Sequence, residues 1–570
     1  MEAPSLKKFR ASSLLAASPA VFVVSIASVL PLGWMAMVIL ANPAVRREFH
    51  LDAFRMELLG RTVGFNAAAA VIATLMGLPA GFVLGRGRGL FAKLLWVILP
   101  AALLLPSLSY AYGWSQFVRI LQPYLRAGDQ TPLFGLFHLP IHLNFRPNGP
   151  ADRFRCIWSL AAWLWAVPAA LVGLSLRRLD TTLQQQALMD GALRRITFRQ
   201  LLGPIIASIC IVTVLATQEF AVYEPTGISV VATEVRMVFD TGSVSTADMP
   251  ITVGGFLGAG AKSPDQPARA AAAVATCTPL LIVTVILAFI AVWGASQSSA
   301  AETLTVGDWP RALDASRWTV AVTVFLLLLN IGTPVVCLIG SLRESLSLPR
   351  IWGEFSPQLL GAMLVATEAA GVALVASFFS AARWIPGLLA LAGASFLVGG
   401  QLLAIALIRL YNRPTLGVDN WVYDTSLIAV IAYIGRFGWL AVAAGRGTWS
   451  RPWRELREMA GLDGATDLST AFNVVWPLAW PVLLAGGLLV GALSLTEVPA
   501  TVLLMPQHPQ VLTPTLMTWV HMVRYDAMIE ASLLMMGAVL VPAVAAVLLT
   551  SFGLRVTRRS LRRATVPERP

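Results

Sequence analysis

Charged side chains are scarce in this sequence. Only 13% of its 570 residues are Asp, Glu, Lys or Arg, whereas 57% are hydrophobic; an average soluble domain has about 25% charged and about 45–50% apolar residues. This composition excludes a soluble globular enzyme. Histidine and cysteine are rarer still, with 5 and 4 residues. The chain therefore has few of the side chains that form catalytic and metal-binding clusters.

Neither a disulfide framework nor a metal site is predicted. His138 and His142 are four residues apart, but Pro140 between them breaks the helix that would align them. No CxxC pair or His/Cys cluster occurs, so we interpret the cysteines as packed single thiols. They lie far apart, within or beside apolar segments: Cys156, Cys210, Cys277 and Cys337.

A phosphate-binding loop is missing as well. Residues 258–263 are Gly-Ala-Gly-Ala-Lys-Ser, but Ala261 stands where the pattern G-x-x-x-x-G-K-[ST] requires its second glycine. The segment is also predicted to lie outside the cell membrane. If the protein uses ATP, we therefore expect the ATPase on another polypeptide.

Long apolar runs are the dominant feature that is present. Runs of about 20 residues recur along the chain, and each can cross a hydrocarbon core of about 30 Å as a helix. We predict an all-α polytopic membrane protein with twelve transmembrane helices. The predicted spans are 13–40, 61–85, 90–116, 156–176, 201–222, 270–294, 317–341, 358–380, 384–410, 424–446, 476–502 and 530–553.

The net charge of +12 reflects topology and does not indicate nucleic-acid binding. The basic residues form short clusters between apolar runs instead of one stripe. More than half of the 42 Lys and Arg residues fall on the side of the two termini, where the loops are shorter. The positive-inside rule therefore places both termini in the cytoplasm.

The spans divide into two sets of six. A polar connector, 295–316, is predicted in the cytoplasm between a first domain, 1–294, and a second domain, 317–570. Two long segments predicted outside, 117–155 and 223–269, both belong to the first domain. This division suggests an internal repeat.

A repeat is found in the cytoplasmic loops. One offset of 273 residues superposes two stretches that share an Asp-Gly-Ala core and a proline thirteen residues after the glycine. The first stretch is Gln185-Gln186-Ala187-Leu188-Met189-Asp190-Gly191-Ala192, followed by Pro204. The second is Glu458-Met459-Ala460-Gly461-Leu462-Asp463-Gly464-Ala465, followed by Pro477.

Each loop is predicted to be two short helices joined at a tight turn. Glycine supplies a backbone conformation that a β-carbon would hinder, and the proline suits the first turn of the following membrane helix. Nearby arginines would hold the loops at the anionic inner leaflet. They are Arg194, Arg195 and Arg199 in the first loop and Arg451, Arg454 and Arg457 in the second.

These loops resemble the EAA loop of type I permeases from binding-protein-dependent ATP-binding-cassette importers. That pattern is Glu-Ala-Ala, three residues, Gly, nine residues, Ile, one residue, Leu-Pro. The first copy has Gln185-Gln186 for Glu-Ala and Gly203 for the Leu, while the second keeps Glu458 but has Met459 and Trp476. Residues 432–437 and 493–504 are similar to the fused, two-domain permeases of the ferric-iron type.

The resemblance implies a permease of two pseudo-symmetric six-helix domains, with EAA-like loops at about 183–204 and 456–477. It implies a multi-pass protein of the cell inner membrane. The expected partners are two copies of a cytoplasmic ATPase, which would bind ATP and Mg, and an extracytoplasmic solute-binding protein. No catalytic residue, metal or cofactor is expected in this chain. The resemblance suggests iron as the solute, and thiamine, phosphonate or other small anions stay open.

Three charged residues are candidates for the translocation path. Arg436 falls inside a predicted span, where a charge must face a bundle interior or a cavity. Glu224 and Glu497 are related by the same offset of 273, and each lies twenty residues after its proline. A helix of that length covers about 30 Å, so both should reach the outer membrane face. The alternatives are a structural partner role for Arg436 and solvated helix-end acids for the glutamates.

Two other function classes remain as alternatives. An ion-coupled secondary transporter with a two-fold repeat would need titrating carboxylates near the midplane and has no use for paired Asp-Gly loops. A membrane-bound enzyme would need a cluster of nucleophile, base or metal ligands, which the sequence lacks. Separately, the Gly487–Gly491 spacing predicts close helix packing.

Overall fold

The computed structural model of the chain describes residues 17–41, 52–103, 105–127, 149–179, 181–241, 266–296, 314–342, 347–412, 419–504, 508–522 and 524–565. Every regular element in these ranges is a helix. Both chain ends, most of the connector 295–316, and parts of 117–155 and 223–269 fall outside them. So do His138, His142 and residues 258–263.

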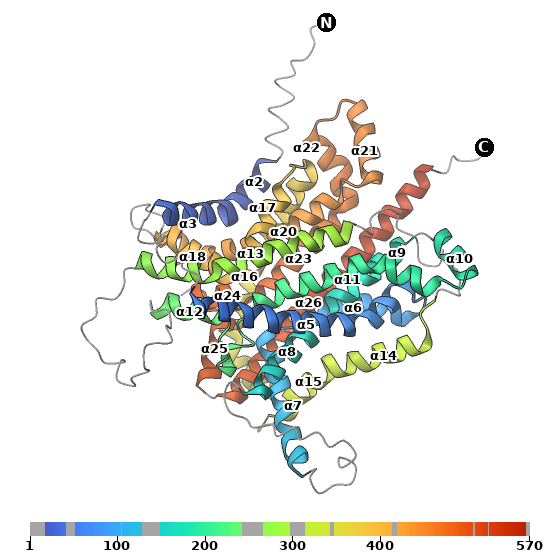
Figure 1. Cartoon of the computed structure of the whole chain (residues 1–570). Coiled ribbons are helices and arrows are strands. Elements are labelled where there is room, and N and C mark those ends of the chain that lie inside the picture. Colours follow the sequence, from blue (N-terminus) through green and yellow to red (C-terminus); the bar gives the residue numbers. More distant parts are fainter. Residues whose placement is uncertain are drawn as a thin grey trace, which may run out of the picture. The chain divides into compact units, whose positions relative to one another are not determined.

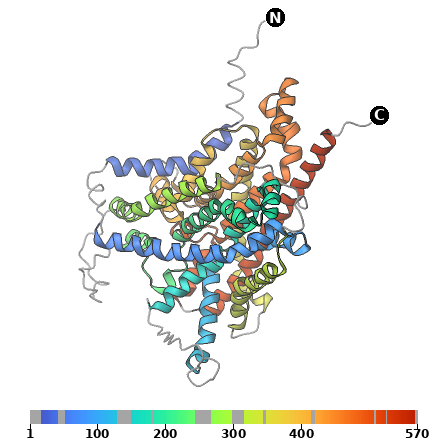
Figure 2. The same ribbon diagram turned by 45° about the vertical axis from the view of Figure 1, so that its right-hand side comes forward.

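The chain forms two compact units. The N-unit comprises residues 43–346 and 520–532, and the C-unit comprises residues 1–42, 347–519 and 533–570. Figures 1 and 2 show the helices in two views.

In the N-unit, α5 packs lengthwise against α9 and α11. The elements are α5 (Ala53–Arg86), α6 (Leu90–Leu103), α7 (Ser107–Ala127), α8 (Pro150–Leu164), α9 (Ala166–Arg178), α10 (Thr181–Met189), α11 (Leu193–Thr217), η4 (Glu224–Thr226), α12 (Val231–Thr241), α13 (Gln266–Ser296), α14 (Arg317–Leu327), η7 (Leu328–Gly332) and α15 (Thr333–Gly340).

In the C-unit, α16 packs lengthwise against α20 and α23. The elements are α2 (Ser18–Val24), η1 (Ser25–Val29), α3 (Leu30–Ala41), α16 (Leu348–Ala382), α17 (Leu388–Val398), α18 (Gly400–Tyr411), α19 (Asp419–Val422), α20 (Leu427–Gly447), α21 (Arg451–Leu462), α22 (Asp467–Thr470), η9 (Ala471–Val475), α23 (Trp476–Thr496), α24 (Pro499–Leu504), α25 (Leu512–His521) and α26 (Tyr525–Thr565). The end of α25 and the start of α26, within residues 520–532, are grouped with the N-unit.

The described ranges contain ten helices long and apolar enough to cross a membrane, or up to eleven if the bent pair α17 and α18 is one span. The protein is therefore a multi-pass helical membrane protein, and the described ranges do not confirm the predicted count of twelve. Two predicted spans are interrupted. The span 90–116 is split into α6 and α7 just before Ser107, where Pro106 has no amide hydrogen to donate. The span 384–410 bends by 101° between α17 and α18, where Gly399 has φ +90°.

The two units do not coincide with the predicted domains 1–294 and 317–570. The first apolar segment, η1 with α2 and α3, packs on α16, α17, α18 and α20 within the C-unit. The first apolar segment of the second half, α14 and α15, packs on α5 and α7 within the N-unit. Each unit thus contains the first apolar segment of the other half of the sequence.

Glycines bring the main helices of each unit close together. At Gly81 in α5, an added β-carbon would lie 2.8 Å from the Cβ of Val172 in α9. At Gly487 and Gly491 in α23, it would lie 2.9 and 3.0 Å from carbonyl oxygens of α16. The predicted close packing at Gly487 and Gly491 is confirmed, because only small residues let two helix backbones approach in this way.

Large apolar side chains also lie exposed on the spans. Phe289 of α13 and Phe325 of α14 are 73% and 63% exposed. Water disfavours such faces, whereas the hydrocarbon core of a bilayer accommodates them.

Candidate functional site

Loop 1, residues 181–192, ends its short helix α10 in a glycine turn. Gly191 has φ +68°, in the left-handed region that favours glycine. The Gly191 amide donates to the Leu188 carbonyl at 3.3 Å, and the Ala192 amide donates to the Ala187 carbonyl at 2.8 Å. These two bonds form a Schellman motif, which satisfies the last carbonyls of a helix.

Loop 2, residues 451–465, forms the same turn with the two equivalent backbone hydrogen bonds. Gly464 has φ +80°. The Gly464 amide donates to Gly461 at 3.1 Å, and the Ala465 amide donates to Ala460 at 3.0 Å. Each donor and acceptor is 273 residues after its counterpart in loop 1. The prediction that both glycines adopt a conformation hindered by a β-carbon is confirmed.

The helices that follow the two turns differ from the expectation. Both are continuous with a membrane span, so only α10 and α21 are short. Pro204 lies well inside α11 instead of in its first turn. Pro477 follows the π-helical turn η9 and lies in the first turn of α23, as expected.

Both loops are tied to the end of a long membrane helix. In the N-unit, buried Gln184 accepts a hydrogen bond from Arg86, the last residue of α5. In the C-unit, Arg457 takes the place of Gln184 and donates to the Ala381 carbonyl of α16 at 2.6 Å. Arg457 also lies over the Trp449 ring, 4.0 Å from its centroid. Burial lowers the pKa of Arg457 to about 10.

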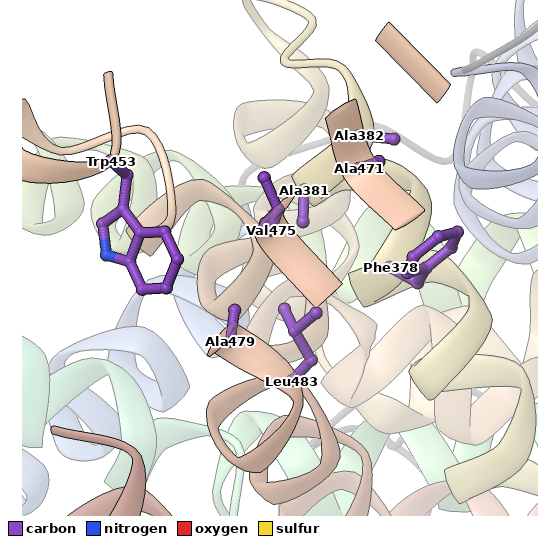
Figure 3. Packing of buried hydrophobic residues seen from close by; sticks show 8 residues of the cluster. All are labelled: Phe378, Ala381, Ala382, Trp453, Ala471, Val475, Ala479 and Leu483. Atoms are coloured by element: carbon purple, nitrogen blue, oxygen red, sulfur yellow. The ribbon is translucent and has the colours of Figure 1, made fainter. Parts of the chain in front are cut away.

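One face of α21 is buried on an apolar cluster. Trp453 belongs to one cluster of buried residues with Phe378 and Ala381 of α16 and with Val475 and Leu483 of the following span (Figure 3). Since α21 is amphipathic, this packing leaves its other face to solvent. On that face, Arg454 and Glu458 form an exposed i,i+4 ion pair at 2.8 Å. Loop 2 therefore packs on the membrane helices through one face of α21 and exposes the other face to solvent.

An exposed apolar side chain stands at the tip of each loop, directly before its Asp-Gly pair. Met189 is 82% exposed and Leu462 is 88% exposed. The remaining predicted loop residues Gln185, Gln186, Asp190, Met459 and Asp463 are exposed too, whereas Ala187 is buried. Two large apolar side chains therefore repeat at equivalent, solvent-facing positions of the two loops.

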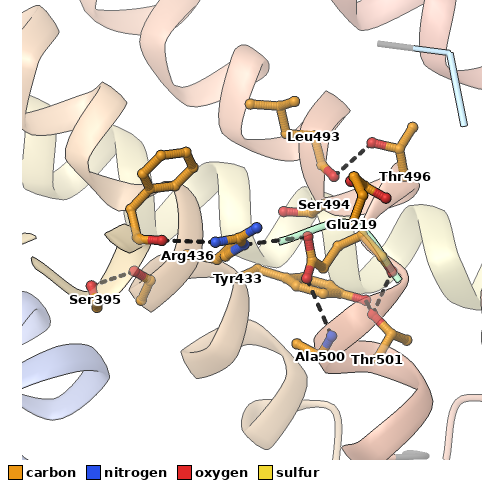
Figure 4. Close-up of polar contacts among 12 residues, drawn as sticks. Glu219, Ser395, Tyr433, Arg436, Leu493, Ser494, Thr496, Ala500 and Thr501 are labelled. Atoms are coloured by element: carbon orange, nitrogen blue, oxygen red, sulfur yellow. Dashed lines mark hydrogen bonds and ion pairs between the residues drawn. The ribbon is translucent and has the colours of Figure 1, made fainter. Parts of the chain in front are cut away.

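Arg436, which Figure 4 labels, forms an ion pair with Glu497 in the C-unit. Both are almost fully buried, and Arg436 Nε lies 3.7 Å from Glu497 Oε2. Arg436 Nη1 also donates to the Phe396 carbonyl at 2.9 Å and lies over the Phe396 ring, with 4.9 Å between Cζ and the ring centroid. The second carboxylate oxygen of Glu497 accepts from the Ala500 amide at 3.2 Å. The expectation that Arg436 faces the bundle interior is confirmed.

Glu224 lies elsewhere. The expectation that it extends the helix of Pro204 is wrong, because α11 ends at Thr217 and Glu224 opens the short turn η4. Its carboxylate pairs with Arg236 of α12 at 2.6 and 2.8 Å. A straight helix of twenty residues therefore does not connect Pro204 to Glu224.

The residue that corresponds to Glu497 is Glu219, which the constant offset missed. The Glu219 amide donates to Ala216 at 3.2 Å, and the Glu497 amide donates to Ser494 at 3.4 Å. Farther on, the amides of Glu224 and Val502 donate to carbonyls in the same register. Beyond the helices the offset is therefore 278, because the second helical segment has five more residues. The dipeptides Glu219-Phe220 and Glu497-Val498, each within two residues of the end of a helix, were the available sequence signal.

Within the described ranges, no group of three or more His, Cys, Asp or Glu side chains could hold a metal ion.

No family model matches the chain, and no curated protein sequence matches it.

Proposed function

We propose that this chain is the permease subunit of an ATP-binding-cassette importer, with both termini and both loops in the cytoplasm of a cell bounded by an inner membrane. One observation supports the proposal above all: two Schellman turns of the same register, each with an exposed apolar tip, repeat on two loops. Duplicated docking elements suit a partner that binds twice. Two copies of an ATPase, which bind ATP and Mg, are such a partner.

The chain itself performs no covalent chemistry in this proposal. ATP binding and hydrolysis in the partner change the equilibrium between two arrangements of the membrane helices, because the partner contacts the loops differently in each state. The ties of loop 1 to α5 and of loop 2 to α16 carry that movement to long membrane helices. An extracytoplasmic binding protein delivers the solute, and iron is the candidate that the sequence resemblance suggests.

The test is purification of the tagged chain from its native membrane, with its partners identified and counted. We expect two ATPase subunits per chain. Replacing Met189 and Leu462 with Asp should reduce the ATPase that purifies with the chain by at least tenfold. Met522, which is 63% exposed on a segment predicted outside, provides the matched control Met522→Asp.

The competing proposal is the ion-coupled secondary transporter. It predicts that no ATPase accompanies the chain and that the tip substitutions change nothing. It also predicts uptake that stops when an ionophore dissipates the ion gradient. That combination of results would replace the importer proposal.

A further inference from the structure

The C-unit contains an apolar helix pair, α17 and α18, that is bent at a break, and in the N-unit two helices, α6 and α7, divide one predicted span. In each unit a glutamate contacts the first residue of the second helix. In the C-unit the break separates α17 from α18 at Gly399. In the N-unit it separates α6 from α7, just before Ser107. A break of this kind leaves carbonyls at the end of one helix and amides at the start of the next without intrahelical partners.

The C-unit break is held by charges of opposite sign. Arg436 donates to the Phe396 carbonyl in the last turn of α17. Glu497 lies against the first residue of α18, since a β-carbon on Gly400 would stand 2.5 Å from its Oε1. A cation at a helix C-terminus and an anion at a helix N-terminus each match the helix dipole. The ion pair between Arg436 and Glu497 joins the two contacts.

The N-unit break has the equivalent carboxylate. Ser107, the first residue of α7, donates its hydroxyl hydrogen to Glu219 Oε2 at 2.8 Å. Ser107 is 5% exposed, so this bond lies away from water. A charged acceptor in such surroundings makes a hydrogen bond stronger than a neutral one. Glu219 and Glu497 thus each contact the first residue of the helix that follows a break.

We propose that Glu219 and Glu497 are a matched pair of positioning residues that hold the two helix breaks. Each carboxylate closely follows the long helix after a loop: Glu497 comes directly after α23, and Glu219 comes two residues after the last residue of α11. A movement of either loop therefore reaches the break in its own unit through one continuous helical segment. The last step rests on the importer proposal: the two breaks open and close with the ATPase cycle.

Hydrogen exchange of the purified chain in lipid nanodiscs tests the positioning role without any partner. Ser107→Ala removes the donor to Glu219, and Gly400→Ala places a methyl group against the carboxylate of Glu497. We expect the first-turn amides of α7 to exchange about tenfold faster, because Ser107→Ala removes one hydrogen bond to a charged group. We expect a similar increase at the first turn of α18, because the added methyl group displaces the carboxylate of Glu497 from the start of that helix. Glu497→Gln, which keeps the shape and removes the charge, should accelerate exchange at α18 as well.

Each variant has a matched control on the same broken helix. Ser115→Ala removes a hydroxyl that donates to the Ala111 carbonyl of α7 itself at 3.0 Å. Gly393→Ala adds a methyl group to α17 at a position with no neighbouring atom within 4 Å. Neither should change exchange at the breaks by more than about twofold. Equal exchange in the variants and their controls would overturn the positioning role.

ATP hydrolysis by the chain purified with its ATPase then tests the link to transport. Gly400→Ala should lower kcat and leave KM for ATP unchanged, because ATP binds on the other polypeptide. A merely structural defect would lower the yield of the complex but leave kcat and KM of the complex that still forms unchanged. If no ATPase purifies with the chain, the importer proposal fails while the exchange result stands. If exchange responds and kcat does not, the glutamates hold the breaks but the link to the ATPase cycle is wrong.

Discussion

Replacing Gly464 tests whether the loop conformation itself is required for coupling. Gly464 has φ +80°, and an added β-carbon would meet no atom within 4 Å. The only cost of Gly464→Ala is therefore the backbone strain of an L-residue in the left-handed region, about 1–2 kcal/mol. Gly464→Val adds the crowding of a branched side chain, for a total of about 1–3 kcal/mol.

Gly461 provides the control in the same loop. It is also exposed and has no atom within 4 Å of an added β-carbon, but it lies within α21 and has no positive φ. Gly461→Ala should therefore stabilise the helix, by about 0.5–1 kcal/mol. Each alanine variant adds one methyl group, at positions three residues apart in the same loop. Their effects on the stability of the loop should have opposite signs.

The assay is hydrogen exchange at the Ala465 amide, whose bond to Ala460 closes the turn, together with the affinity for the ATPase. We expect faster exchange and weaker ATPase binding for Gly464→Ala, and slower exchange with unchanged or tighter binding for Gly461→Ala. The difference of about 2 kcal/mol corresponds to about thirtyfold in the equilibrium of the turn. Membrane insertion should be unaffected in both.

The result that refutes this reasoning is equal behaviour of the two alanine variants. Transport at the normal rate by Gly464→Val would separately refute the coupling role of loop 2. The equivalent change at Gly191 should have a smaller effect, because loop 1 has Gln185 where loop 2 has Glu458.

Three further predictions concern topology and the buried charges. A cysteine at Ser296 should react only with reagents added from the cytoplasm and one at Trp421 only with reagents added outside; exchanged accessibility would contradict the predicted topology. Arg436→Met should destabilise the protein by about 3–5 kcal/mol, because it leaves Glu497 buried without its cation, and adding Glu497→Gln should restore part of the lost thermal stability. Glu224→Gln should cost about 0–1 kcal/mol, as for a partly exposed ion pair, so a loss of uptake as large as that of Glu497→Gln would show that Glu224 has a role beyond stability.

Much of the loop structure could be predicted because it depends on neighbouring residues. The turn at Gly191 or Gly464 is closed by hydrogen bonds that reach no farther than five residues back, and glycine alone supplies its positive φ without strain. The membrane helices are likewise local features, since an apolar run of sufficient length can satisfy its backbone only as a helix. The sequence therefore determined the helical membrane fold and both turns.

The tertiary structure decided which groups meet. An apolar helix such as α3 has no sequence feature that selects its neighbours, so its place in the C-unit follows only from packing. Arg436 was visible as a buried charge, but its partner, the Phe396 carbonyl, is forty residues away and becomes available only because α17 ends there. The correspondence of Glu219 with Glu497 depends on where two long helices end, and a constant offset cannot follow five extra residues and a π-helical turn in one of them. Local backbone preferences fix the turns and helices, whereas the contacts that hold the broken helices form only when distant segments pack together.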